Sequence, residues 1–226
     1  MLDTLIVSDI HDGDKRCIHS AIAELMVHVG PAKRLILAGD TLDSWATCEW
    51  DVAWLKDIVN HLAPQEVIVL RGNHDPIDLQ IRLGTSFTVM DSYDLSVADG
   101  RYKVIHGHQY DTLFVKHSTY VWLCYLLHTF FLNKFGWDLQ KLLRFSVSKY
   151  SRSAYFKKFV RSAINQMMQD FQNYRGVICG HTHYPIRVEH AQFDYINCGD
   201  LLTNYSYVGM DSDGYPYLRG YFPVVS

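Results

Sequence analysis

The stretch Leu5-Ile6-Val7-Ser8-Asp9-Ile10-His11 is an apolar run, typical of a β-strand, that ends on two side chains able to hold a metal ion. Four further short apolar runs, at 34–38, 66–70, 102–105 and 176–179, end in the same way, on Asp40, Asn73, His106, and His181 with His183. Each run is about the length of a buried strand. Because the carboxyl ends of strands in an α/β sheet form the crevice where ligands bind, we expect these seven side chains to converge in one metal pocket.

The composition is that of an ordinary globular protein. The chain has 226 residues, 48% of them hydrophobic, which is enough to bury a core as one domain, or as one domain carrying an insertion. Its five cysteines show no CxxC spacing, which argues against a disulfide framework or a thiolate zinc site and fits a reducing compartment. The residues before the first strand leave no room for a signal peptide. These features predict a cytoplasmic location.

Residues 112–175 differ in character from the rest of the chain. They hold ten Lys and Arg against two Asp, a net charge of +8, so the remaining residues carry −11 of the total of −3. They also hold 15 of the 31 aromatic residues and no proline. From Ala154 onward apolar residues recur at three- and four-residue spacing, which predicts a basic amphipathic helix. We therefore expect a helical, aromatic cap at 112–175, inserted into a core formed by residues 1–111 and 176–226.

Within that insertion, residues 118–132 carry no formal charge and are rich in aromatic and aliphatic side chains. At 15 residues the run is shorter than the roughly 20 needed to cross a bilayer. Three interpretations stay open: a buried helix that packs the cap onto the core, a groove for an apolar substrate, and peripheral docking at the inner face of the membrane.

Outside the insertion, helical and extended segments alternate. Residues 15–28 and 48–62 read as helices between the first three strands, which is typical of βαβ crossovers. After the last metal-binding residues the pattern indicates two hairpins, one pairing 187–189 with 193–197 and the other pairing 205–210 with 215–221. The sequence therefore predicts mixed sheets covered by helices.

Five ordered blocks resemble the motif set of the calcineurin-like metallophosphoesterases. They are Asp9-Ile10-His11, Gly39-Asp40-Thr41-Leu42-Asp43, Gly72-Asn73-His74-Asp75, His106-Gly107 and Gly180-His181-Thr182-His183. Any one block is a weak signal, but five in order at matching strand ends are specific. The resemblance implies an α/β (α+β) fold, a four-layer α-β-β-α sandwich of two mixed sheets flanked by helices.

The resemblance also implies a ligand set for two divalent metal ions. One metal would take Asp9, His11 and His183, the other would take Asn73, His106 and His181, and Asp40 would bridge the pair. All of these donors are oxygen or nitrogen atoms, which favours Mn²⁺, Fe or Zn²⁺ over softer ions, with Mn²⁺ as the expected metal.

Two further residues have catalytic roles by the same resemblance. His74 would act as the general acid that protonates the leaving oxygen, and Asp43 would pair with it and fix its tautomer. The nucleophile would be a hydroxide shared by the metals, attacking in line. His108 and Asp111 line the entrance to the cap in one interpretation and only begin a loop in the other, and Asp75 with residues 197–200 is explained equally well by turns.

The cap bears on the choice of substrate. It resembles the branch of the family that contains UDP-2,3-diacylglucosamine diphosphatases, although that branch carries Arg in place of His74 and an acid in place of His108. The sequence thus predicts a phosphohydrolase acting on a phosphodiester or diphosphate, including nucleotide-linked lipids. A broad-specificity or cyclic-nucleotide phosphodiesterase and a nuclease are the alternatives, with nucleic acid the less favoured partner, and a non-enzymatic scaffold is the least favoured.

Overall fold

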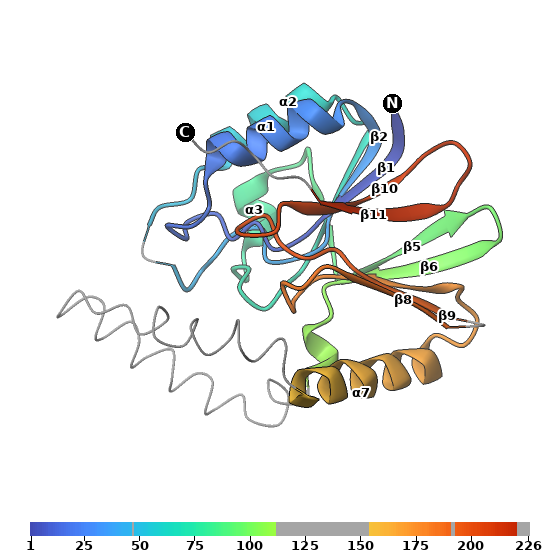
Figure 1. The fold of residues 1–226 in the computed structure, drawn as a ribbon. Helices are drawn as coiled ribbons and strands as arrows, with labels where there is room; N and C mark the ends of the chain where they lie inside the picture. Colours follow the sequence, from blue (N-terminus) through green and yellow to red (C-terminus); the bar gives the residue numbers. More distant parts are fainter. Residues whose placement is uncertain (47, 112–153, 191–192, 221–226) are drawn as a thin grey trace. The chain divides into compact units, whose positions relative to one another are not determined.

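The computed structural model describes residues 1–46, 48–111, 154–190 and 193–220. The chain divides into two compact units, Met1–Gly107 with Phe171–Ser226, and His108–Asp170. The first unit contains two β-sheets with their flanking helices (Figure 1). The described part of the second unit contains the 3-10 helix η1 (His108–Tyr110) and the helix α7 (Ala154–Asp170).

The first sheet has six strands in the order β11-β10-β1-β2-β3-β4. Four of them run parallel to one another: β1 (Leu2–Val7), β2 (Ala32–Leu37), β3 (Glu66–Leu70) and β4 (Thr88–Met90). The antiparallel hairpin of β10 (Ser206–Met210) and β11 (Pro216–Gly220) extends the sheet beyond β1. Because β1, β2 and β3 are parallel neighbours, their carboxyl ends lie at one edge of the sheet.

The second sheet has five strands in the order β5-β6-β7-β9-β8. The strands are β5 (Ser92–Val97), β6 (Gly100–Ile105), β7 (Gly176–Cys179), β8 (Ile186–His190) and β9 (Phe193–Asn197). β6, β7 and β9 are parallel. At the edges of the sheet, β5 pairs antiparallel with β6, and β8 pairs antiparallel with β9. The carboxyl ends of β6 and β7, which carry the remaining predicted ligands, therefore also lie together.

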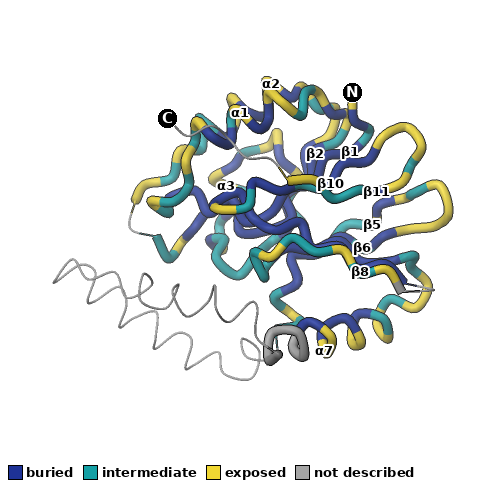
Figure 2. Tube along the Cα trace, in the orientation of Figure 1, coloured by how far each residue is buried: buried dark blue, intermediate teal, exposed yellow. Residues whose placement is uncertain are grey.

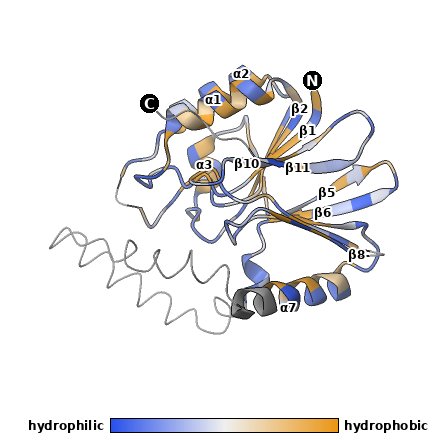
Figure 3. Cartoon of the chain, viewed as in Figure 1, coloured by the Kyte–Doolittle hydropathy of each residue, from blue (hydrophilic) through white to orange (hydrophobic). Residues whose placement is uncertain are grey.

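The central strands β1, β2 and β3 of the first sheet are largely buried on both faces, as their apolar runs indicate. Side chains alternate across the pleat, so Leu5 and Val7 join the core beneath the helices while Ile6 joins a second core with Val104 and Ile178 of the other sheet. The central strands are accordingly buried in Figure 2 and hydrophobic in Figure 3. Two cores, one on each face of the first sheet, hold the first unit together.

Helices α1 (His19–Val29) and α2 (Val52–Leu62) cover the outer face of the first sheet. Both begin about four residues later than the sequence suggests. Asp14 accepts the backbone N–H of Arg16 (2.8 Å), which holds the preceding segment in a turn. Asp51 caps α2 by accepting the N–H of Trp54 (2.9 Å), which fixes its first residue.

The structure confirms the predicted fold class, two mixed sheets with flanking helices. The short helix α3 (Leu79–Leu83) and the strands β4 and β5 were not predicted from the sequence. The helix expected from Ala154 onward is present as α7. Residues 112–153 lie outside the described residues, so the cap over 112–175 and the interpretations of 118–132 stay predictions. Among the described helices, none has the length and apolar character needed to cross a membrane.

Candidate metal centre

Every predicted metal-binding side chain follows a strand end in the first unit. Asp9 and His11 follow β1, Asp40 follows β2, Asn73 follows β3, His106 follows β6, and His181 and His183 follow β7. Hydrogen bonds between the loops tie these ends together, for example Asp9 N–H to Gly39 O (3.1 Å) and Gly180 N–H to His106 O (3.0 Å). The structure thus brings together residues that are separated by up to 174 positions in the sequence.

The backbone at the site adopts a conformation that most side chains avoid. Five of the seven predicted ligands have left-handed φ angles between 50° and 68°: Asp9, His11, Asp40, His181 and His183. In this region an L-residue is strained by about 1–2 kcal/mol. Such strain persists only where surrounding contacts over-determine it, and it clusters at functional sites.

Three glycines directly precede ligands and leave room for the side chains of other ligands. A Cβ at Gly39 would lie 2.3 Å from His106 Nδ1, one at Gly72 would lie 2.1 Å from Asp40 Oδ1, and one at Gly180 would lie 2.4 Å from Asp9 Oδ2. Each glycine therefore allows one loop to approach the ligand of another strand. The blocks are interlocked in space as well as ordered in sequence.

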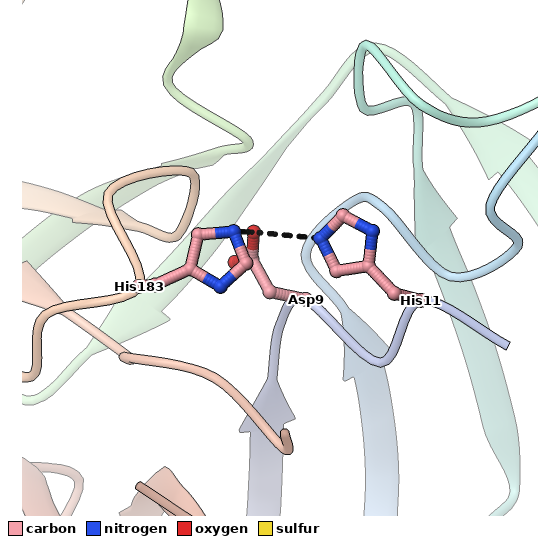
Figure 4. A group of neighbouring side chains, drawn as sticks. All are labelled: Asp9, His11 and His183. Atoms are coloured by element: carbon pink, nitrogen blue, oxygen red, sulfur yellow. Dashed lines mark ion pairs between the residues drawn. The ribbon is translucent and has the colours of Figure 1, made fainter. Parts of the chain in front are cut away.

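The first group of ligands is Asp9, His11 and His183 (Figure 4). Asp9 Oδ1 lies 3.4 Å from His183 Nε2 and 3.7 Å from His11 Nε2, and the two imidazole rings are stacked with their centroids 5.1 Å apart. These separations exceed hydrogen-bond length. They suit donors that share one cation, because metal–ligand distances of about 2.1 Å place two ligands about 3–3.5 Å apart.

Asp40 lies between this group and a second one. Its Oδ2 is 3.6 Å from His11 Nε2 and 3.3 Å from His106 Nε2, the position expected of a bridging carboxylate. Asn73 Oδ1 lies 3.2 Å from His106 Nε2, and the ring of His181 meets that of His106 edge-on at 5.3 Å. The geometry therefore brings together the residues expected to form a second metal position.

Two buried polar atoms show that cations fit this pocket. Asp9 Oδ1 and His11 Nε2 are inaccessible to solvent, and neither has a hydrogen-bond partner among the described residues. An unsatisfied buried polar atom costs about 1–3 kcal/mol, and native proteins rarely keep one without a reason. Since both atoms point toward each other, one coordinated cation would satisfy both.

Outer partners orient the imidazoles, as is typical around metal ligands. Nδ1 of His106 lies 2.9 Å from Ala38 O, Nδ1 of His183 lies 3.1 Å from Asp200 Oδ2, and Nδ1 of His11 lies 3.0 Å from Asp43 Oδ2. In each case Nε2 is left to face the pocket.

Asp43 also contacts His74. Its second oxygen, Oδ1, lies 3.0 Å from His74 Nδ1, so one carboxylate holds both His74 and His11. The side chain of His74 is 20% exposed, whereas that of His11 is 3% exposed. His74 is therefore the member of this pair that a substrate can reach from solvent.

Charges in the pocket are strongly coupled. Burial acts to raise the pKa of the Asp9 and Asp40 carboxyls. The neighbouring histidines together outweigh it, led by His183 at Asp9 and by His106 at Asp40, and hold both pKa values below their usual range. Burial opposes a charge on His106 as well, yet the Asp40 carboxylate raises its pKa to about 9. The pocket thus favours positive charge held among ionised carboxylates, as a divalent cation requires.

Two supporting residues were not assigned to the site from sequence. Asp75 joins the β2 and β3 loops by accepting the N–H groups of Thr41 and Leu42 (2.9 Å each) and of Gly72 (2.8 Å). Burial first, and then the charge of Asp40, raise its pKa to about 6. Asp200 contacts the proposed ligand His183, although its sequence context is that of a turn.

His108, which the sequence suggested as a residue near the substrate, lies in the second unit, where it begins η1.

A different cluster, Asp12, Cys17 and His19, also has metal-ligand chemistry but is already satisfied. His19 Nε2 lies 2.9 Å from Asp12 Oδ1, the other Asp12 oxygen accepts the N–H of Asp51 (2.6 Å), and His19 stacks on Trp54 at 3.9 Å. Burial raises the pKa of the Cys17 thiol to about 12, which disfavours the thiolate that binds metal. The polar atoms of Asp12 and His19 lie at hydrogen-bond distances, whereas those of Asp9, His11 and His183 lie farther apart. We therefore interpret this cluster as structural.

The protein is thus of the class that has two mixed sheets and, where the strands end, a cluster of histidines and carboxylates that could hold a metal ion. Residues 2–185 match the family model of the calcineurin-like phosphoesterases, and the chain belongs to that family. The resemblance seen in the five sequence blocks is thereby confirmed at the level of the family. No curated protein matches the sequence significantly.

Solved structures with a similar fold carry different descriptions. An archaeal phosphodiesterase superposes with a TM-score of 0.51 at 16% identity, covering 96% of this chain and 99% of its own. Vacuolar protein sorting 29 from Cryptosporidium parvum gives 0.52 at 13% identity, covering 97% of each chain, and Vps29 from Chaetomium thermophilum gives 0.51 at 11%, covering 96% and 95%. At these identities the likeness shows the fold alone, and function must be argued from the site.

Proposed function

We propose that the protein is a dimetal-dependent phosphohydrolase that cleaves a phosphodiester or diphosphate bond. The observation that carries this proposal is the pair of buried, unsatisfied atoms Asp9 Oδ1 and His11 Nε2 beside a carboxylate, Asp40, that lies between His11 and His106. When bound, two divalent cations would supply an activated water and neutralise charge on the phosphoryl oxygens. We expect Mn²⁺, with Fe and Zn²⁺ as alternatives.

In this proposal some residues bind the metal ions and others transfer or orient a proton. Asp9, His11 and His183 would hold one cation, Asn73, His106 and His181 would hold the other, and Asp40 would contact both. His74 donates a proton to the leaving oxygen from Nε2, because Asp43 holds its Nδ1 at 3.0 Å. Since Asp43 also holds His11, it fixes the proton donor relative to the metal ligands.

For the substrate, we propose a nucleotide-linked diphosphate or diester, with UDP-2,3-diacylglucosamine as the first compound to test. The net charge of +8 on residues 112–175 suits phosphate groups, and the aromatic residues of this segment suit acyl chains. The same segment would give a cytoplasmic protein peripheral contact with the inner face of the membrane. A nuclease is the alternative that the basic charge favours, and it predicts binding that weakens steeply with salt.

The test combines metal analysis with hydrolysis. Purified protein should take up divalent metal, and with Mn²⁺ it should cleave at least one member of a panel of phosphomonoester, phosphodiester, cyclic nucleotide, single-stranded nucleic acid and UDP-2,3-diacylglucosamine. His74→Ala should lower kcat by about 100- to 10,000-fold while metal content stays near wild type. His61→Ala, at an exposed histidine near the end of α2, is the matched control. Protein that stays metal-free and inert would contradict the proposal and favour a scaffold.

A further inference from the structure

Trp45 lies against the imidazole of His74. The centroids of the two rings are 4.1 Å apart, and their planes are tilted by 42°. We propose that Trp45 is a positioning residue that holds the His74 ring in the orientation needed for proton donation. This inference rests on the proposed function, in which His74 is the general acid.

The three residues from Asp43 to Trp45 contact His74 at separate points. Asp43 Oδ1 lies 3.0 Å from His74 Nδ1, and the carbonyl oxygen of His74 accepts from the N–H (2.9 Å) and the hydroxyl (2.6 Å) of Ser44. The backbone N–H of Trp45 donates to the same Asp43 Oδ1 at 2.9 Å. One short segment therefore fixes the backbone of His74, orients the carboxylate that binds its ring, and places an indole against the ring itself.

The hydrogen bond to Asp43 alone does not set the tilt of the ring, because an imidazole bound only at Nδ1 can still pivot about that contact. Its neighbours limit the pivot. The ring of His11 meets it edge-on, with centroids 4.7 Å apart and planes at 79°, and the indole of Trp45 contacts it at 4.1 Å. Nε2, which Cε1 separates from Nδ1, has no hydrogen-bond partner among the described residues, and the ring contacts set its direction.

Proton transfer needs a donor within about 2.6–3.2 Å of the leaving oxygen, and a misplacement of about 1 Å can cost 100-fold in rate. Loss of the indole should therefore slow reactions in which the leaving group must be protonated. A p-nitrophenolate departs readily without a proton, whereas the more basic phenolate depends on the general acid. Comparing the rates with the two leaving groups distinguishes a misplaced His74, which slows only the phenolate reaction, from a loss of binding or folding, which slows both reactions.

The experiment compares bis(p-nitrophenyl) phosphate with diphenyl phosphate, two diesters of similar shape, using the full-length protein with Mn²⁺. Trp45→Ala should lower kcat for diphenyl phosphate at least tenfold more than kcat for bis(p-nitrophenyl) phosphate, with KM little changed. Trp45→Phe, which keeps an aromatic face, should restore most of the loss. His74→Ala should show the same dependence on the leaving group.

Trp54→Ala is the matched control, because Trp54 also stacks on a histidine, His19, at 3.9 Å, in the cluster that we interpret as structural. It should affect both esters equally. If Trp45→Ala does not fold, as judged by its melting temperature and metal content, Trp45→Leu replaces it. Equal losses on both esters, or a raised KM without a change in kcat, would overturn the role of Trp45. A wild-type protein inert toward both esters and the wider substrate panel would instead overturn the proposed function.

Discussion

Replacing Gly72 with alanine should weaken metal binding without removing any proposed ligand. The new Cβ would lie 2.1 Å from Asp40 Oδ1 and 2.3 Å from the Asp40 backbone nitrogen, far inside van der Waals contact. Gly72 does not have a positive φ, so the effect is one of space and not of backbone conformation. Because a backbone atom is among the contacts, relief of the clash requires the loop that carries Asp40 to shift, and a change of side-chain rotamer is not enough.

The size of the effect follows from where the strain falls. Forcing an extra methyl group into a packed site costs about 1–3 kcal/mol. In the metal-free protein Asp40 can shift away, but the metal-bound protein requires Asp40 in place. Most of the cost should therefore fall on the bound state, which corresponds to a metal affinity lowered by about 10- to 100-fold.

The assay is a Mn²⁺ titration in which calorimetry measures the affinity. Melting temperatures are also measured in chelator and in excess Mn²⁺. Gly72→Ala should melt near wild type in chelator and gain less stability from the metal. Gly220→Ala is the control, because a Cβ there meets no atom of the described residues within 4 Å and Gly220 does not have a positive φ. Equal Mn²⁺ affinities in the two variants would refute the reasoning that Gly72 makes room for a metal-binding Asp40.

Two further predictions concern outer groups. Asp200→Asn removes the carboxylate that lies 3.1 Å from His183 Nδ1, so Mn²⁺ affinity should fall about 10- to 100-fold in the same titration, and an unchanged affinity would exclude this role. Exposed Cys48 should react rapidly with a thiol reagent at pH 8, whereas burial raises the pKa of Cys17 to about 12, so Cys17 should stay protonated and react slowly until the pH approaches that value. The Cys48→Ser/Cys124→Ser double variant isolates the slow phase, and rapid labelling of Cys17 at pH 8, located by peptide mapping, would show that the thiol is ionised.

The parts of the fold that the sequence predicted well are the continuous apolar runs. The bounds of β3 and β7 coincide with the predicted runs, since each is a continuous apolar segment that ends at a ligand block. The missed elements lack that signal. α3 spans only five residues, and β5 mixes exposed and buried side chains at the edge of its sheet.

The residues of the candidate site were named from the sequence, whereas the contacts between them were not. Nothing in the sequence indicates that Asp43 binds His11 as well as His74, that Asp200 supports His183, or that Trp45 covers His74, because these contacts join loops from different strands. They arise where the register of the strands and the left-handed turns bring the loops together. The interpretation of Asp200 as a turn residue was incomplete for this reason: it accepts the N–H of Thr203 (3.0 Å) and also holds an imidazole.

The sequence by itself determined which atoms are available and where they emerge, because an apolar run that ends in Asp, Asn or His places that side chain at the carboxyl end of a buried strand. Only the tertiary structure decided which of these atoms are satisfied. Hydrogen bonding and burial depend on distances between residues far apart in the chain, and packing closes the gap for Asp12 and His19 but leaves Asp9 Oδ1 facing His11 Nε2 at 3.7 Å. That gap distinguishes a site for a cation from a pair of hydrogen-bonded side chains.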